Sequence, residues 1–249
     1  MQIAIEPLKI QSLKDACVSR LEQLILSGGL KIGEQLPSER DFALRIGVSR
    51  PVLHAALVDL DSKGLVKIIP RRGVFVSDFR RSGSTAILGS LIAYHAGNLD
   101  PALTRSLIEM RLLVETETAR LAALNRTEQQ LVKFRSLLDQ EAEAACGDPQ
   151  TLTDLDFSFH LSIAIVSGNL VYPLIINSFK GVYTHLTGGF FSRYGGTAVA
   201  EAVRQFHIQI VAAFECREAG SAVTTMMAML NHGAAYLKKS PTPEERSPG

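Results

Sequence analysis

A carboxylate and an imidazole lie four residues apart where an uncharged segment of the chain begins. The stretch DLDFSFH contains Asp156 and His160, and residues 161–179 carry no charge. On an α-helix this spacing places both side chains on one face, one turn apart. Such a pair can cap a helix, form a hydrogen bond in a core, or supply half of a metal site. The elements elsewhere in the chain must decide among these interpretations.

The composition indicates a globular protein without a chain-wide charge signature. Its 249 residues are 46% hydrophobic, which is enough for one large domain or two ordinary ones, and the net charge is +1. Affinity for nucleic acid must therefore come from a local patch. Up to Arg81 there are 13 Lys and Arg against 9 Asp and Glu, whereas the remainder has 13 against 16. The basic excess thus lies at the N-terminal end.

The cysteines and the uncharged segment indicate the compartment. Cys17, Cys146 and Cys216 are scattered, with no CxxC pair and no secretory signal ahead of them, so we expect reduced thiols and a cytoplasmic protein. Ser-Gly-Asn at 167–169 and Pro173 interrupt the uncharged segment. We therefore expect two buried helices there, and no membrane span.

The first eighty residues have the pattern of a winged helix-turn-helix. Helix starts are expected at Ser12, Ser38 and Ser49, and the second and third helices are joined by Gly-Val-Ser. Beyond Gly64 the stretch LVKIIPRRGVFV is β-branched on both sides of Pro-Arg-Arg-Gly, as expected for a hairpin with a basic tip. In this architecture the third helix enters the major groove of DNA, and the hairpin wing lies along the backbone or minor groove.

Several side chains of this domain are expected to face DNA. Those of the third helix would contact base edges, and those of the wing would contact the backbone. The alternative is a protein-docking module whose arginines are ordinary solvated charges, but the helix spacing and the wing together favour DNA. The predicted DNA-binding residues are Arg40, Ser49, Arg50, His54, Arg71, Arg72 and Gly73.

The same residues carry a specific resemblance. The stretch GEQLPSERDFALRIGVSRPVLHAALVDLDSKGLV, followed by RRGVFV, resembles the DNA-binding domain of the GntR family of bacterial transcription regulators over residues 10–77. The resemblance implies that Arg40, Arg50 and the wing residues Arg72 or Gly73 occupy DNA-contacting positions. The family's usual Arg-Glu in the recognition helix is His54-Ala55 here. Loss of a permanent cation that can bind guanine through two hydrogen bonds should change the operator sequence or weaken binding.

Beyond a polar linker the chain reads as helical. We expect a DNA-binding domain at 1–79, a linker at 80–84, an all-α bundle of about seven helices at 85–239 and a disordered tail at 240–249. The motifs EMRLLVETETARLAA, DFSFHLSIAIVSGN, HIQI and MLNH resemble the effector-binding FCD domain of the FadR-type branch of the same family. The predicted fold is therefore mainly α, a winged helix-turn-helix followed by a helical effector-binding bundle.

The resemblance implies a metal site in that bundle. Asp156, His160, His207 and His232 match four positions that bind a divalent cation in many members of the branch, although a histidine on an apolar helix is commonly a core residue. The interval from His207 to His232 is about three residues longer than usual, and an insertion in the connection could leave both ligands aligned. The donor set suits Zn²⁺ or Ni²⁺, with Mn²⁺ possible. Arg111 is the candidate for holding an effector carboxylate, unless it pairs with Glu109 or Glu115 at the surface.

These observations predict a transcription regulator and not an enzyme. We expect a homodimer on two-fold-symmetric operator DNA, repression relieved by a small carboxylate metabolite, and no membrane association. A long-chain acyl-CoA is the alternative effector, since the apolar residues at 161–191 could line an acyl tunnel. A metal-dependent hydrolase and a docking protein without DNA affinity are the alternatives from other classes, but the chain has no HExxH motif.

Overall fold

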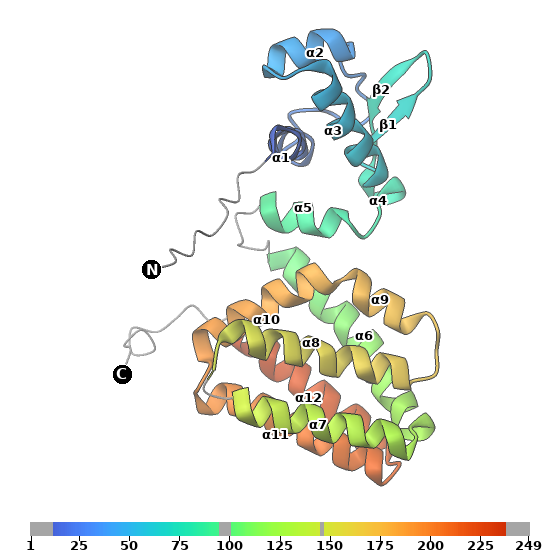
Figure 1. Cartoon of the computed structure of the whole chain (residues 1–249). Coiled ribbons are helices and arrows are strands. Elements are labelled where there is room, and N and C mark those ends of the chain that lie inside the picture. The colour runs from blue at the N-terminus through green and yellow to red at the C-terminus, as the bar shows by residue number, and fades with distance from the viewer. Residues whose placement is uncertain (1–11, 95–100, 145–146, 238–249) are drawn as a thin grey trace, which may run out of the picture. The chain divides into compact units, whose positions relative to one another are not determined.

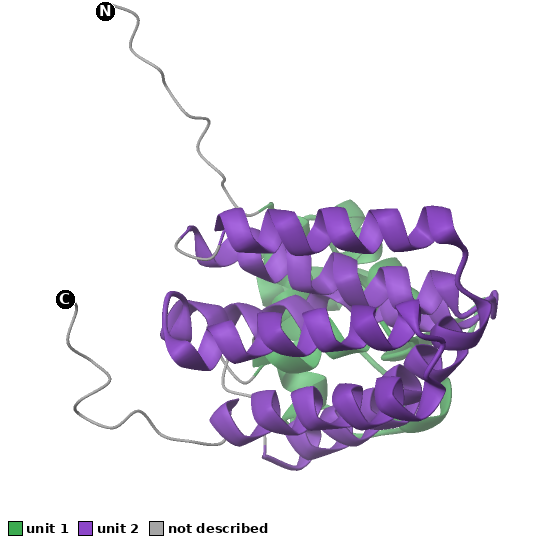
Figure 2. Cartoon of the chain, turned by 90° about the horizontal axis from the view of Figure 1, so that it is seen from below, with its two compact units in different colours: residues 1–98 green, residues 99–249 purple. Residues whose placement is uncertain are grey.

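The computed structural model describes residues 12–94, 101–144 and 147–237 (Figure 1). The chain divides into two compact units, residues 1–98 and 99–249 (Figure 2). Within the described residues there are twelve helices and one two-stranded sheet, which confirms the predicted class. The expected disordered tail at 240–249 lies outside the described residues.

The first unit is a winged helix-turn-helix. Ser12 and Ser38 accept hydrogen bonds from the backbone N–H groups of Asp15 and Asp41, so the first two helices begin where expected. Gly47 ends the second helix with a left-handed φ of 80°, which glycine adopts without steric cost. The elements are α1 (Leu13–Leu26), α2 (Glu39–Ile46), α3 (Arg50–Ser62), β1 (Val66–Ile69), β2 (Gly73–Val76), α4 (Phe79–Ser82) and α5 (Ile87–Tyr94).

The wing is an antiparallel hairpin with a three-residue tip. β1 and β2 pair from Val66 opposite Val76 to Ile69 opposite Gly73, so the tip is formed by residues 70–72. The buried strand residues join a core made with α1 and α3, which fixes the wing to the helices.

The first unit extends past the expected linker. The predicted linker at 80–84 overlaps α4, and α5 groups with the DNA-binding unit instead of the helical bundle. Ile87 of α5 lies in the core of the first unit. The buried Glu22 accepts hydrogen bonds from Lys63 at 2.6 Å and from Ser90 at 2.7 Å, which ties α1, α3 and α5 together. An apolar contact and a shared carboxylate therefore both hold α5 in place.

The second unit is an all-α bundle in which α8 has a central position. α8 contacts α6, α7, α9 and α10, so its side chains can meet those of many helices (Figure 1). α12 packs against α6 and α11. The elements are α6 (Pro101–Asn125), α7 (Glu128–Ala144), α8 (Pro149–Val166), α9 (Tyr172–Ser178), α10 (Lys180–Tyr194), α11 (Ala198–Glu215) and α12 (Ala219–Leu237).

The uncharged segment supplies the end of α8 and the whole of α9. Gly168, with φ of 78°, and the following residues separate the two helices, and Pro173 lies in the first turn of α9, where its missing N–H is tolerated. The structure thus has two helices across this segment, as the sequence predicts. The expectation that both are buried is wrong for α9, in which Ile176 is the one buried residue and Leu174 is 69% exposed. Among the described residues we find no helix with the length and apolar content that a membrane span requires.

Candidate functional site

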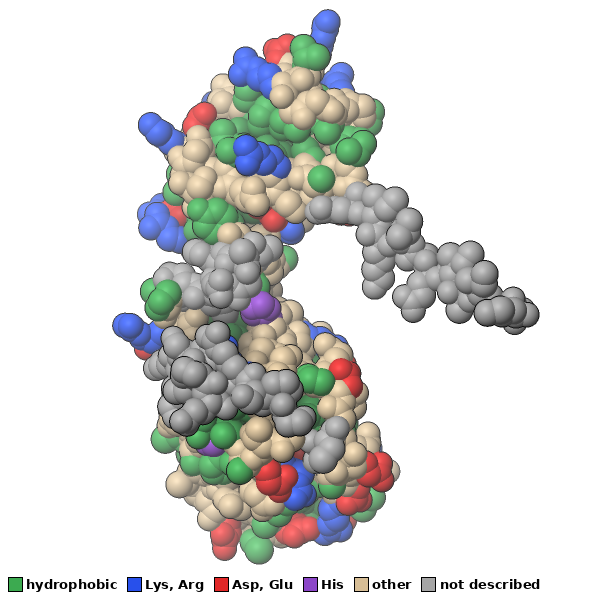
Figure 3. All heavy atoms as spheres, turned by 90° about the vertical axis from the view of Figure 1, so that its left-hand side faces the viewer, with side chains coloured by type: hydrophobic (Ala, Val, Ile, Leu, Met, Phe, Trp, Pro, Cys, Tyr) green, Lys and Arg blue, Asp and Glu red, His purple; other side chains and the backbone are tan. Residues whose placement is uncertain are grey.

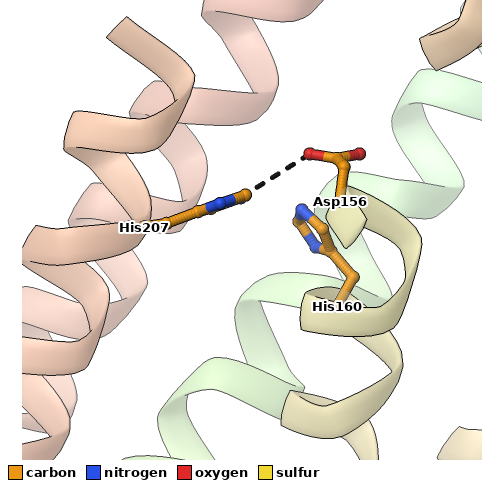
Figure 4. Close-up of side chains that lie close together, drawn as sticks. All are labelled: Asp156, His160 and His207. Carbon is orange, nitrogen blue, oxygen red and sulfur yellow. Dashed lines mark ion pairs between the residues drawn. The ribbon is translucent and has the colours of Figure 1, made fainter. Parts of the chain in front are cut away.

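Three side chains with metal-binding chemistry meet in the core of the second unit. Asp156 and His160 lie one turn apart on α8, and His207 faces them from α11 (Figure 4). One potential ligand atom from each residue lies within 4.8 Å of those of the other two. The three residues are 5%, 2% and 1% exposed. The sequence expectation that Asp156 and His160 share a helix face is confirmed.

Each histidine of this cluster has a carboxylate behind it. Glu141 of α7 accepts a hydrogen bond from Nδ1 of His207 at 2.9 Å, and the Glu115 carboxylate of α6 lies against Nδ1 of His160 in a close ion pair. With Nδ1 of each ring directed at a carboxylate, Nε2 is left as the ligand atom. Nε2 of His207 is buried, has no hydrogen-bond partner among the described residues and lies 3.6 Å from Oδ1 of Asp156. Sequence reasoning named Glu115 only as a possible partner of Arg111, and it missed Glu141.

The third member of the cluster is also held by a hydrogen bond. The hydroxyl of Tyr183, on α10, donates to Oδ2 of Asp156 at 2.7 Å, while Oδ1 points toward His207. The ring of Phe159 stacks on that of His207 with centroids 3.9 Å apart. The orientation of each potential ligand is thus fixed by a neighbour on another helix or by ring stacking.

The charges around the cluster are strongly coupled. Burial favours the neutral form of Glu115, but the charges of Arg111 and His160 outweigh burial and lower its pKa to about 2. Burial by itself lowers the pKa of His207, yet the charge and hydrogen bond of Glu141 raise the pKa above its ordinary value overall. Glu141 therefore makes the His207 ring more basic, which strengthens a metal ligand.

The cluster fits a divalent cation. One carboxylate and two imidazoles are ligands common to Zn²⁺, Mn²⁺ and Fe²⁺ sites, and hydrogen-bonded carboxylates behind the histidines are typical of such sites. The orphaned Nε2 of His207 adds to this, because a buried polar atom without a partner is costly unless it is used. Asp156, His160 and His207 would hold the ion.

His232 does not join the cluster among the described residues. Its Nε2 lies 3.0 Å from the carbonyl oxygen of Val199 at the start of α11. The ring lies among Phe190, Phe206 and Tyr236. The structure therefore brings together three of the four residues predicted to bind a metal.

Arg111 lies behind the cluster. Its Nε donates to Glu115 at 2.5 Å, and its guanidinium lies 4.2 Å from the centroid of the Tyr183 ring. The pairing with Glu115 was one of the two sequence interpretations, but the pair is buried in the bundle and not at the surface. Arg111 also lines a small cavity beside Asp156 and His160. Its assignment as an effector-binding residue stays a prediction.

Two cavities adjoin the cluster. The larger, of about 340 Å³, is lined by Glu141, Asp156 and His207 on one side and by the first turns of α11 on the other. The smaller, of about 50 Å³, is the one beside Arg111. Asp156 lines both cavities, so a ligand in either one would meet its carboxylate.

The residues predicted to bind DNA are exposed on the first unit. The side chain of Glu39 pairs with Nε of Arg50 at 3.3 Å and with Nδ1 of His54 at 2.9 Å, which aligns these two residues of α3. Arg40 and Ser49 are exposed, and the Ser49 side chain makes no capping hydrogen bond. Lys and Arg side chains project from several places on the face of this unit in Figure 3.

The tip of the wing is shaped by its backbone. Arg71 has a left-handed φ of 63°, and Gly73 has a φ of 110°. Nε2 of Gln35 donates to the carbonyl of Arg72 at 2.7 Å, and a Cβ atom on Gly73 would come within 2.9 Å of this nitrogen. A glycine at position 73 lets the loop before α2 approach the wing and leaves the Arg71 and Arg72 side chains exposed.

Both units have counterparts among known proteins. Residues 13–76 match the family described as bacterial regulatory proteins, gntR family, and residues 106–232 match the FCD domain. The HTH-type transcriptional regulator Mce2R of Mycobacterium tuberculosis is 32% identical over 185 residues, 73% of this chain and 74% of that protein. The fatty acid metabolism regulator protein of Yersinia enterocolitica is 31% identical over 160 residues, 64% of each chain.

The fold has a solved counterpart as well. The structure of Lar, which controls the expression of the Listeria monocytogenes agr system and mediates virulence, covers 92% of this chain and 98% of its own, with a TM-score of 0.62 and 19% identity. At this identity the likeness shows the fold alone.

Proposed function

The chain belongs to the GntR family of bacterial regulatory proteins and carries an FCD domain, so it is a DNA-binding transcription regulator and not an enzyme; from this premise we propose how it is controlled. The protein acts in the cytoplasm as a homodimer on two-fold-symmetric operator DNA. A divalent cation held by Asp156, His160 and His207 binds a small carboxylate metabolite, and this ligand relieves repression. The observation that carries the proposal is the buried cluster beside a cavity of about 340 Å³.

The size of that cavity favours a small acid over an acyl-CoA. Pockets for small molecules span roughly 300–1,000 Å³, and about 340 Å³ lies at the lower end of this range. A long acyl chain with its coenzyme needs far more space. A relative that is a fatty acid metabolism regulator keeps acyl-CoA as the alternative effector. Tight binding of acyl-CoA by the metal-free protein would reverse this preference.

The charges of the cavity make the effector's binding depend on the metal. Three carboxylates line the cavity, those of Glu141, Asp156 and Glu201, against one guanidinium, that of Arg204. Arg204 already donates to Glu201 at 2.6 Å. Without a cation this lining repels a carboxylate, whereas a divalent ion at the cluster offsets the excess negative charge and offers open positions to ligand oxygens. An acid that binds equally well to the chelated protein would contradict this account.

In the DNA-binding unit, Arg50 and His54 pair with Glu39 in the free protein and contact DNA instead when the operator is bound. Arg50 and His54 share this carboxylate and are otherwise exposed, so pairing orients them at little energetic cost. Bases and phosphates then replace Glu39 as partners of the two side chains. The free Ser49 hydroxyl at the start of α3 is placed to donate to a phosphate.

The test is a matched pair of aspartate variants. Native mass spectrometry of the wild type, purified without chelator, should give a dimer with one divalent ion per chain. Asp156→Ala should lower metal content and melting temperature together, because a ligand that binds the folded state stabilises it. Asp154→Ala, on the exposed side of the same helix, is the control and should change neither. Full metal occupancy and an unchanged melting temperature in Asp156→Ala would refute the site.

A further inference from the structure

Met229 is one of five α12 residues that line the small cavity beside the metal cluster, and it is the one among them whose side chain carries a possible donor atom. Met229 is 4% exposed and lines the small cavity together with Asp156, His160 and Arg111. That cavity measures about 50 Å³. His232 does not line this cavity, and its ring nitrogen is used by the carbonyl of Val199.

The different surroundings of Met229 and His232 follow from their spacing on α12, where His232 lies three residues after Met229. Three residues along an α-helix correspond to a rise of about 4.5 Å and a rotation about 60° short of a full turn. Met229 thus lines the cavity beside the cluster, whereas His232 lies at the start of α11, against the carbonyl of Val199.

We propose that the metal site of this chain has three protein ligands, Asp156, His160 and His207, and that Met229 closes the fourth direction without acting as a ligand. This inference rests on the proposed metal site. A thioether is a weak donor to hard divalent ions, so Met229 leaves the remaining positions of the ion to water and to the effector carboxylate. A two-histidine, one-carboxylate set with open positions suits a five- or six-coordinate ion such as Fe²⁺ or Mn²⁺ better than tetrahedral Zn²⁺.

Arg111 and Glu115 support the same assignment from the opposite side. The guanidinium of Arg111 lines the small cavity beside Met229, and its charge is balanced by Glu115 directly behind His160. A third imidazole facing this cavity would lie near the guanidinium, because the cavity measures only about 50 Å³. A thioether there adds no charge and needs no partner. The open positions of the ion thus lie between an apolar wall and the guanidinium of Arg111, which can still donate hydrogen bonds to carboxylate oxygens.

The experiment titrates the full-length apo-protein with Co²⁺, whose visible absorption is weak in five- or six-coordinate sites and intense in four-coordinate ones. The wild type should give the weak spectrum. His232→Gln retains a donor for the Val199 carbonyl and should leave the Kd and the spectrum unchanged, as should Met229→Leu, which keeps the apolar volume. Met229→His should add a ligand, giving the intense spectrum and a lower Kd for Co²⁺.

The outcomes separate this inference from the function on which it rests. If His232→Gln loses Co²⁺ as Asp156→Ala does, His232 is a ligand and the inference is wrong, while the proposed metal site stands. Loss of binding in Met229→Leu would make the thioether a ligand and would also overturn the inference. If the folded wild type binds no Co²⁺, the proposed metal site itself fails. Circular dichroism of each variant establishes that the helical fold is retained.

Discussion

At the scale of single residues, the paired carboxylates and imidazoles are the most informative feature of the helical unit. A buried histidine normally gives both ring nitrogens a partner, but His207 gives one to Glu141 and keeps the other free toward Asp156. This asymmetry distinguishes a ligand histidine from a core histidine. It is also what could not be predicted from sequence, because Glu141 lies 66 residues from His207 in the chain.

The carboxylate behind His207 should matter for metal affinity although it touches no metal. Glu141→Gln is expected to weaken metal binding by about 10–100-fold, because the amide no longer raises the basicity of the ring or fixes its orientation as firmly. Glu143→Gln, at an exposed position on the same helix, is the control. Isothermal titration of the apo-protein with Mn²⁺ measures both. Equal affinities in the two variants would mean that Glu141 does not orient a metal ligand.

At the scale of elements, two glycines with the same backbone conformation meet different surroundings. Gly47, between α2 and α3, has a φ of 80° and open space where a Cβ atom would lie. Gly64, after α3, has a φ of 75°, and a Cβ atom there would come within 2.0 Å of the Ser82 carbonyl oxygen in α4. Gly64 therefore permits the close approach of two segments as well as a turn.

The two positions should respond differently to alanine. Gly47→Ala is expected to lower the free energy of unfolding by about 1–2 kcal/mol, because a residue with a Cβ atom is strained in the left-handed conformation. Gly64→Ala should cost about 1–3 kcal/mol more, because α4 must also shift away. Urea unfolding followed by circular dichroism measures both. Similar losses would show that α4 moves aside without resistance.

A second consequence at this scale concerns acid stability. Glu115 joins α6 to α8 through His160, and its pKa is about 2 in the folded state against an ordinary value of 4.5. Because the folded pKa is depressed, the stabilisation by the ionised carboxylate is fully present above pH 4.5. It is lost as the pH falls through the interval from 4.5 to about 2.

Glu115→Gln should therefore destabilise the bundle most at neutral pH. Removing one member of a buried ion pair costs about 3–5 kcal/mol, since Arg111 would stay buried without its partner. The difference from the wild type should be constant above pH 4.5 and shrink below it. Glu109→Gln, exposed on the same helix, should show no such difference. Urea unfolding at several pH values gives the comparison, and a pH-independent difference would contradict this explanation.

At the scale of the whole molecule, the sequence predicts the architecture better than the site. The helix starts at Ser12 and Ser38 follow from local capping, and the wing follows from the residues around its turn. Both features depend only on residues close together in the sequence, so both can be predicted from it. The grouping of α5 with the first unit depends on Ser90 meeting Glu22, 68 residues away. The position of His232 likewise depends on its contact with the carbonyl of Val199, 33 residues away, which a motif comparison does not reveal.

The coupling between the two units should obey reciprocity. If loading with Mn²⁺ changes the Kd for operator DNA by a factor, commonly about 5–150, then operator DNA must change the Kd for Mn²⁺ by the same factor. Fluorescence anisotropy with DNA selected from a random pool, with and without chelator, gives the first factor. Metal titration with and without that DNA gives the second. Unequal factors would mean that one conformational equilibrium does not connect the sites, and Asp156→Ala should abolish both effects.

The hydrogen bond of the Tyr183 hydroxyl makes the intrinsic fluorescence of the protein sensitive to the metal cluster. The chain contains no tryptophan and five tyrosines, so its ultraviolet emission comes from phenol rings alone. A phenol that donates to a carboxylate emits weakly, and the phenol of Tyr183 donates to Asp156 at 2.7 Å. A closed-shell cation such as Zn²⁺ that binds this carboxylate should weaken the hydrogen bond and increase the emission, whereas an open-shell ion such as Mn²⁺ should quench it. Occupancy can therefore be followed by fluorescence in the unlabelled protein.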